Sequence, residues 1–164
     1  MAGESNESDL LAAIIGELKT ALSLPDARCY PVFAPNTQKP NFTGSGNYVL
    51  QVSLGDPQAL QDEQGQEILL ESVPIEVTIY TTIKLDKKDR DDKAIYEVNR
   101  GMLPLRRRVR RALTGLQVEG GASLVHWESA SRPNYDAQEG VSWQTVYFSV
   151  DLDLDLISAD DEEP

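Results

Sequence analysis

His126 is the only histidine of the 164-residue chain, and Cys29 is its only cysteine. A structural zinc site needs several nitrogen and sulfur ligands, so these two residues cannot supply a standard set. A catalytic triad would need His126 beside a serine from a distant segment, which the sequence alone leaves open. We expect instead that His126 is a strand residue that points outward, and that the chain is not an enzyme.

Motifs for binding phosphate or activating a nucleophile are absent. The sequence has no P-loop, no Rossmann glycine pattern and no Gly-x-Ser-x-Gly elbow, and the Gly-Ser-Gly at 44–46 lacks a strand-to-helix setting. The acids at 86–92 alternate with lysine and arginine and do not follow the order of an EF-hand, so they fit a solvated helix start. We therefore expect no cofactor and no bound metal.

A run of arginines is the sharpest feature of the sequence. Five of them fall within six positions, namely Arg106, Arg107, Arg108, Arg110 and Arg111. In a helix they would occupy most of the arc that an apolar stripe leaves free. Guanidinium groups bind phosphates and carboxylates through paired hydrogen bonds. The partner would then be nucleic acid, a neighbouring identical subunit, or the chain's own acidic strand and tail; the plain alternative is a solvated helix face.

Acidic residues gather at the other end of the chain. The formal net charge is −12 at pH 7, and residues 151–164 contain seven acids and no base. A negative net charge repels nucleic acid and anionic membranes. These acids would also compete with nucleic acid for the arginines, so we favour carboxylate partners. The predicted subunit-interface residues are the five arginines together with Asp151, Asp153 and Asp155.

Two helices are predicted from apolar residues at helical spacing. The first covers 10–23, with Asp9 as its cap. The second covers 89–113, where the apolar residues share an arc of about 100°. Pro104 predicts a kink in this second helix, with a break near Gly101 as the alternative.

Strands are predicted from period-two alternation between turn residues. They cover 30–33, 48–54, 75–85, 123–129 and 141–156. The last two, joined by a loop at 132–140, would form a hairpin in which Trp127 and Trp143 pair across the strands. Together these elements predict an α+β fold: a mixed or antiparallel sheet of about four to five strands, packed with two main helices in a single layer on one face.

The chain is predicted to form a single domain. Residues 9–157 should share one core, while 1–8 and the acidic stretch 158–164 should be disordered. The polar start does not resemble a signal peptide, and no run of about 18 apolar residues could span a membrane. Because one cysteine cannot form an internal disulfide, we expect synthesis in the cytoplasm.

The order of these elements resembles that of the tail terminator and tail-completion proteins of long-tailed bacteriophages. The similarity covers residues 8–157 and includes the helix end VRRALTG at 109–115, the segment LVHWE at 124–128 and the segment WQTVYFSV at 143–150. The loop at 35–46 and the acidic end match no pattern shared with that family. The family shares its architecture with tail-tube and other neck proteins.

The resemblance implies a structural virion protein that catalyses no reaction. Its subunits would form a homohexameric ring that caps the tail tube and joins it to the head. The implied partners are further copies of the chain, the tail tube protein and a neck or head-completion protein, with a sheath protein as a further candidate. DNA would pass through the ring without specific binding. The implied location is the virion, and the host cytoplasm during assembly. Two alternatives stay open, another ring component of the neck or tube and a nucleic-acid-binding module that uses the helix at 106–111.

Overall fold

The structure is a computed structural model that describes residues 2–35, 40, 48–82 and 91–153. Each α-helix is followed by a run of strands, and the sheet they form is mostly antiparallel, so the fold class is α+β, as predicted. In chain order the elements are α1 (Ala2–Leu22), the 3-10 helix η1 (Asp26–Arg28), β1 (Cys29–Pro31), β2 (Tyr48–Leu54), β3 (Gln58–Gln61), β4 (Glu67–Thr82), α2 (Asp91–Leu113), β5 (His126–Ala130), β6 (Asn134–Asp136) and β7 (Val141–Asp153).

The strands of the described residues form one seven-stranded mixed sheet. The order across it is β1-β2-β4-β7-β5, while β3 pairs with the beginning of β4 and β6 with the beginning of β7. The pair β1 and β2 is parallel, and the other pairs are antiparallel. The long central pair is β4 and β7, which stay in register from Leu70 opposite Asp153 to Thr82 opposite Val141.

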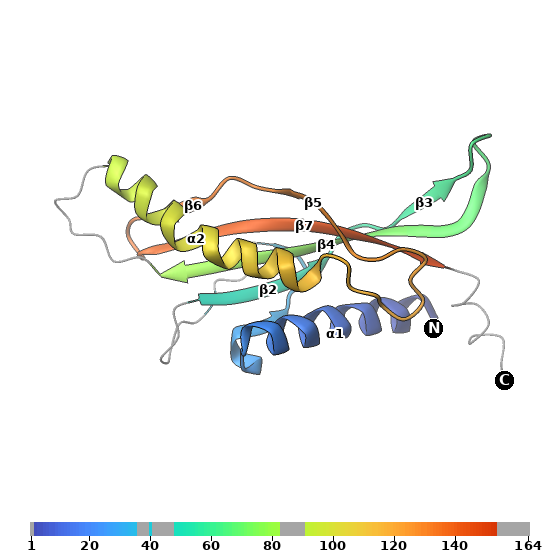
Figure 1. The fold of residues 1–164 in the computed structure, drawn as a ribbon, viewed down its shortest axis with the longest axis horizontal. Helices are drawn as coiled ribbons and strands as arrows, with labels where there is room; N and C mark the ends of the chain where they lie inside the picture. Colours follow the sequence, from blue (N-terminus) through green and yellow to red (C-terminus); the bar gives the residue numbers. More distant parts are fainter. Residues whose placement is uncertain (1, 36–39, 41–47, 83–90, 154–164) are drawn as a thin grey trace.

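Both helices cover the same face of the sheet, as predicted (Figure 1). Alternate positions of the central strands point toward the helices because successive side chains of a strand point to opposite faces. These core positions are Leu50, Val52, Val73, Ile75, Val77, Ile79, Val146, Phe148, Val150 and Leu152. The helices contribute Ile14 and Leu18 from α1, and Met102, Val109 and Leu113 from α2.

The first helix is longer than the sequence pattern predicted. It begins at Ala2 instead of at the expected cap, Asp9, so the helix includes residues 2–8. The amphipathic pattern starts only near Asp9 and could not reveal this extension. Once later turns are anchored in the core, each added residue of good helix propensity, such as alanine or glutamate, extends the helix at little cost.

The second helix is continuous across Pro104, and the alternative break near Gly101 does not occur. Pro104 is exposed on the outer side of α2, while the core stripe on the inner side continues past it. The helix is followed by Gly115, whose φ of 84° is the left-handed conformation that glycine adopts readily at helix ends. A long, rigid arginine-bearing helix results.

The sheet is larger than the four to five strands predicted, because the prediction missed β3 and β6. The strand β6 lies inside the segment 132–140, which was expected to be a loop. The strand β4 begins at Glu67 and not at Ile75. These additional segments are mostly exposed or half-buried and show no sustained alternation of apolar and polar residues. Their backbone hydrogen bonds to a neighbouring strand decide their conformation, and a sequence pattern does not encode that neighbour.

Two further strands differ from the prediction, and the first is β1, which ends at Pro31 and not at residue 33. The strand β5 begins at His126 and not at residue 123, because the chain first crosses to the end of α2, where the Val125 amide donates to the Leu116 carbonyl at 2.9 Å. The predicted ends of the strands 75–85 and 141–156, most of the loop 35–46 and the stretch 158–164 lie outside the described residues.

The two tryptophans do not pair with each other, so that prediction was wrong. Trp127 lies opposite Phe148 on the helix-covered face, with ring centroids 5.4 Å apart and an interplanar angle of 87°. Trp143 lies opposite Tyr80 on the other face, with centroids 6.3 Å apart. The register of β5 against β7 decides this, because a shift of one residue exchanges the faces.

Candidate assembly interface

Three arginines of α2 form a ridge on the side of the helix that points away from the core. At about 100° per residue, Arg107 and Arg111 fall opposite the fully buried Val109, and Arg100 lies in line with them. All three side chains are exposed. We call Arg100, Arg107 and Arg111 the arginine ridge.

The remaining arginines occupy the flanks of α2. Arg106 is half-buried. On the same flank, the guanidinium carbon of Arg110 lies 4.5 Å from the ring centroid of Trp127 in a cation–π contact with β5. Arg108 is exposed on the opposite flank. The five arginines that the sequence presents as one run therefore face several different surroundings.

The positive charge of α2 is largely unneutralised within the described part of the chain. Arg100 forms an ion pair with Glu97 at 3.4 Å, and the side chain of Arg100 is 78% exposed, so the pair contributes little stability. No described carboxylate forms an ion pair with an arginine between residues 106 and 111. The ridge is thus available to an acidic partner.

The predicted acidic partners lie on the other side of the sheet. Asp151 and Asp153 occupy β7 positions that alternate with the core residues Val150 and Leu152, so they face away from the helices. Both are half-buried. Asp155 lies outside the described residues. The sheet therefore separates Asp151 and Asp153 from the arginine ridge within one protomer.

We call the side of β2, β4, β5 and β7 that faces away from the helices the open face. These four strands contain no lysine and no arginine. The carboxylates of the open face are Glu76, Glu128, Asp151 and Asp153. Small hydroxyl groups lie between them, including the paired hydroxyls of Thr78 and Thr145 at 3.0 Å, which are buried at the centre of this face. The exposed and half-buried charges of the open face are therefore acidic, in contrast to those on the outer side of α2.

His126 is exposed, as predicted, and it has two partners on the open face. Its Nε2 lies 2.8 Å from the Ser149 hydroxyl and 2.7 Å from Oε1 of Glu128, and the Ser149 hydroxyl donates to the same Oε1 at 2.6 Å. The Ser149 hydrogen bond lowers the pKa of the Glu128 carboxyl, and the charge and hydrogen bond of His126 add to this, while partial burial opposes it.

This cluster does not have the geometry of a catalytic triad. In a triad, the carboxylate binds one ring nitrogen and the serine binds the other. Here a single nitrogen of His126 faces both Ser149 and Glu128, and the serine proton is committed to the carboxylate. The hydroxyl is therefore not activated. The cluster ties β5 to β7 next to the bulge between Trp127 and Ser129.

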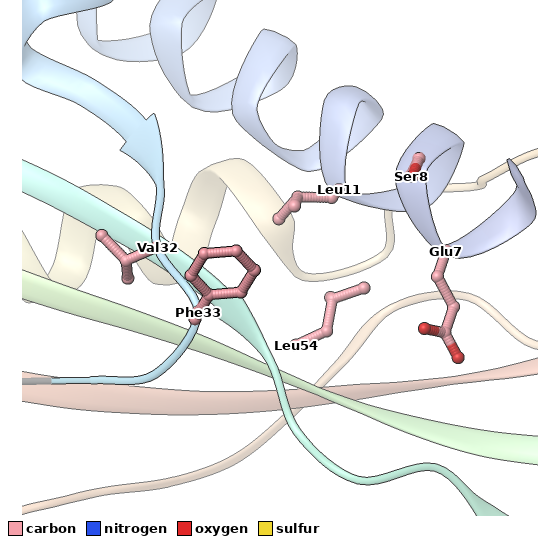
Figure 2. Close-up of a pocket in the computed structure, with 6 residues that line it drawn as sticks. All are labelled: Glu7, Ser8, Leu11, Val32, Phe33 and Leu54. Carbon is pink, nitrogen blue, oxygen red and sulfur yellow. The ribbon is translucent and has the colours of Figure 1, made fainter. Parts of the chain in front are cut away.

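A shallow apolar hollow of about 250 Å³ lies between the beginning of α1, the residues after β1 and the end of β2 (Figure 2). Its lining residues are Glu7, Ser8, Leu11, Val32, Phe33 and Leu54. Phe33 is fully exposed, and its ring lies at the rim of the hollow. Two polar side chains at one end do not converge on a common point, so this hollow does not resemble a catalytic or cofactor site.

Sequence reasoning missed Glu76, Glu128 and Ser149 as members of one acidic face. The alternation of β4 and β7 was visible, but nothing in the sequence indicated that these strands are neighbours. The missing signal is the register of Glu76 opposite Tyr147 and of His126 opposite Ser149. Register depends on long-range strand pairing, which a single sequence specifies only through the whole fold.

No family model matches the chain, and a search of curated proteins finds no match. Among the described residues, no helix combines the length and the apolar character needed to cross a membrane. The same residues contain no group of three or more histidine, cysteine, aspartate or glutamate side chains placed to hold a metal ion.

Proposed function

We propose that this protein is a structural assembly subunit whose copies form a closed ring through head-to-tail contacts. The biological setting that fits best is the end of a phage tail tube, where a homohexameric terminator ring would join the tube to the neck. The element order supports this setting through its resemblance to tail terminator and tail-completion proteins. The proposal includes neither catalysis nor a cofactor.

One observation carries the proposal. The arginine ridge and the acidic open face lie on opposite sides of the same protomer, and no described ion pair joins them. Opposite charges on opposite sides cannot neutralise each other within one copy, so the ridge attracts an acidic surface of a second copy in a fixed orientation. Such a contact joins two different surfaces, and it forms a ring when its rotation closes.

The open face also suits the inner wall of a ring through which DNA passes. Its strands lack lysine and arginine, and it carries Glu76 and Glu128. Carboxylates repel the phosphate backbone, so DNA would move past them without being retained. In this arrangement the helices α1 and α2 form the outer layer of the ring.

The experiment that tests the proposal compares oligomeric mass and particle shape. We expect native mass spectrometry and electron microscopy to show rings at high protein concentration or on isolated tube ends. Arg107→Glu and Arg111→Glu should weaken the rings, while Arg132→Glu, an exposed reversal outside α2, should not. All three variants should melt close to the wild type, since exposed substitutions usually change stability by about 0.5 kcal/mol or less. A protein that stays monomeric at high concentration and on tube ends would refute the proposal.

A nucleic-acid-binding module is the second candidate, and the unneutralised charge of the arginine ridge favours it. Binding to phosphate would weaken steeply with salt, roughly one power of salt concentration per phosphate contact. A DNA-binding titration at several salt concentrations separates the candidates. Tight, salt-sensitive binding that Arg107→Glu abolishes, in a protein that forms no rings, would favour the module.

A further inference from the structure

The hairpin of β3 and the beginning of β4 projects from the body of the protein as an arm. We define the arm as residues 56–72. Figure 1 shows β3 and the first part of β4 extending past the rest of the sheet, on the side away from the N-terminal end of α2. Its ladder runs from Gln58 opposite Ser72 to Gln61 opposite Glu67, and β7 joins β4 only from Leu70 onward. The outer half of the arm is therefore a two-stranded ribbon.

The arm is strongly acidic. It contains five acids and no lysine or arginine, namely Asp56, Asp62, Glu63, Glu67 and Glu71. Asp62 shapes the tip, since its Oδ1 accepts hydrogen bonds from the amides of Gln64 at 2.9 Å and Gln66 at 2.8 Å. Asp56 and Glu63 are exposed, and Glu71 is half-buried. The tip is thus held in one shape while carboxylates elsewhere on the arm stay available.

The arm also carries surface that an isolated protomer leaves uncovered. Leu69 is 57% exposed, one of few large apolar side chains in the described residues with so much exposure. The edge strand β3 has the sequence Gln-Ala-Leu-Gln, without a charged residue to discourage pairing with another chain. Two-stranded ribbons are only marginally stable in water unless something packs against them. These features favour a docked state for the arm.

The arginine ridge matches the arm in charge pattern and in length. Between Arg100 and Arg107 the outer side of α2 carries Pro104, which is exposed and uncharged. The ridge is about 16 Å long at a rise of ~1.5 Å per residue. The arm's part of β4, residues 67–72, is about 17 Å long at ~3.4 Å per residue. Both surfaces therefore place charge on either side of an uncharged centre.

We propose that the arm of one copy lies along the arginine ridge of α2 in the next copy. The contact rests on the proposed function, because the neighbour is the next subunit of the ring. It is heterologous, since arm and ridge are different surfaces of the chain. Leu69 packs over the uncharged stretch at Pro104, and the arm carboxylates pair with the ridge guanidinium groups. The acidic open face then takes no part in this contact.

The arm is a better partner for the ridge than the acids of β7. Asp151 and Asp153 are half-buried in a flat sheet, and the Asp151 backbone is already bonded to the Ala122 amide and the Ser123 hydroxyl. A long exposed helix ridge meets few carboxylates on such a surface. An arm that projects past the body can reach a neighbour without bringing two sheets face to face.

A charge-swap experiment tests this contact. The arm variant is Glu63→Lys with Glu71→Lys, and the ridge variant is Arg107→Glu with Arg111→Glu. Each should weaken self-association about ten- to hundredfold in sedimentation or mass photometry. When the two variants are mixed, the glutamates on the ridge of one protein meet the lysines on the arm of the other, so mixed assemblies should form. The matched control for the arm variant is Asp9→Lys with Glu119→Lys. It changes the net charge by the same amount as the arm variant, at exposed sites outside both surfaces.

The outcomes separate this inference from the proposed function. If the arm variant still forms rings as the wild type does, the arm contact is overturned, while the proposed ring stands. Failure of the mixed variants to associate, with both variants folded by circular dichroism, would also overturn it. A wild-type protein that never assembles would overturn both. A ridge variant that loses only DNA binding would assign the ridge to nucleic acid.

Discussion

The guanidinium carbon of Arg110 lies 4.5 Å from the ring centroid of Trp127. The same indole packs edge-on against Phe148, with ring centroids 5.4 Å apart. A positive charge on α2 is thereby linked through one aromatic ring to the core of the sheet. Arg110 thus positions α2 over β5, while Arg107 and Arg111 of the ridge have no ion pair with a described carboxylate.

Arg110→Ala should lower the free energy of unfolding by about 0.5–1 kcal/mol, the range for a cation–π contact near the surface. Part of the loss comes from the arginine stem, which covers the indole. Urea denaturation would measure the change. Arg107→Ala serves as the control, and it should change stability little because Arg107 has no described partner. Equal effects of the two substitutions would contradict the linking role.

Ser149→Ala should raise the pKa of Glu128 toward its ordinary value, because the hydroxyl bond is the largest cause that lowers it. A lowered folded-state pKa adds stability above the unfolded pKa, and this stability is lost as the pH falls through the folded pKa. The wild type should therefore lose more stability on acidification than the variant. NMR titration of the Glu128 carboxyl tests the shift, and Ser129→Ala is the control. A Glu128 pKa that does not move in Ser149→Ala would contradict the assignment.

Cys29 should be unreactive toward thiol reagents in the folded protein. It is 2% exposed, and burial raises its pKa to about 11. We expect no labelling at about pH 8 until denaturant is added. Rapid labelling of the native protein would contradict the buried position at the start of β1.

The raised pKa of Cys29 also predicts how the free energy of unfolding changes at alkaline pH. Because the folded-state pKa of Cys29 is raised, the protonated thiol contributes to the free energy of unfolding. This contribution is fully present below the unfolded pKa and is lost as the pH rises through about 11. Burial also raises the pKa of Tyr80, so alkaline titration of the wild type alone is ambiguous. Cys29→Ala isolates the thiol and should show a flatter decline of unfolding free energy at high pH. Parallel curves for the two proteins would contradict the prediction.

Ser149 should not react with phosphonate or activated-ester reagents that label serine nucleophiles. Its proton is donated to Glu128, and His126 faces both groups with a single nitrogen. Accordingly, His126→Ala should leave assembly intact. Mass spectrometry after labelling provides the measurement. Labelling that depends on His126 would revive the possibility of a catalytic triad that the sequence left open.

Apolar periodicity by itself determined the main elements of this protein. It identified α2 through a stripe that includes Met102 and Val109, and it identified β2 and the core side of β7 through alternation. Burial of a helix stripe or a strand face leaves a regular pattern that is local in sequence. The α+β class and the single helix layer followed from that pattern, as did the exposure of His126.

Only the tertiary structure decided which charged groups lie near one another. The arginine run at 106–111 reads as one cluster, but helix geometry separates Arg110, stacked on Trp127, from the ridge. Asp151 lies on the far side of the sheet from that ridge because its neighbours Val150 and Leu152 point into the core. The arm owes its shape to the pairing of β3 with β4. Strand register and face are long-range properties, because a shift of one residue exchanges every side chain between the two faces of a sheet.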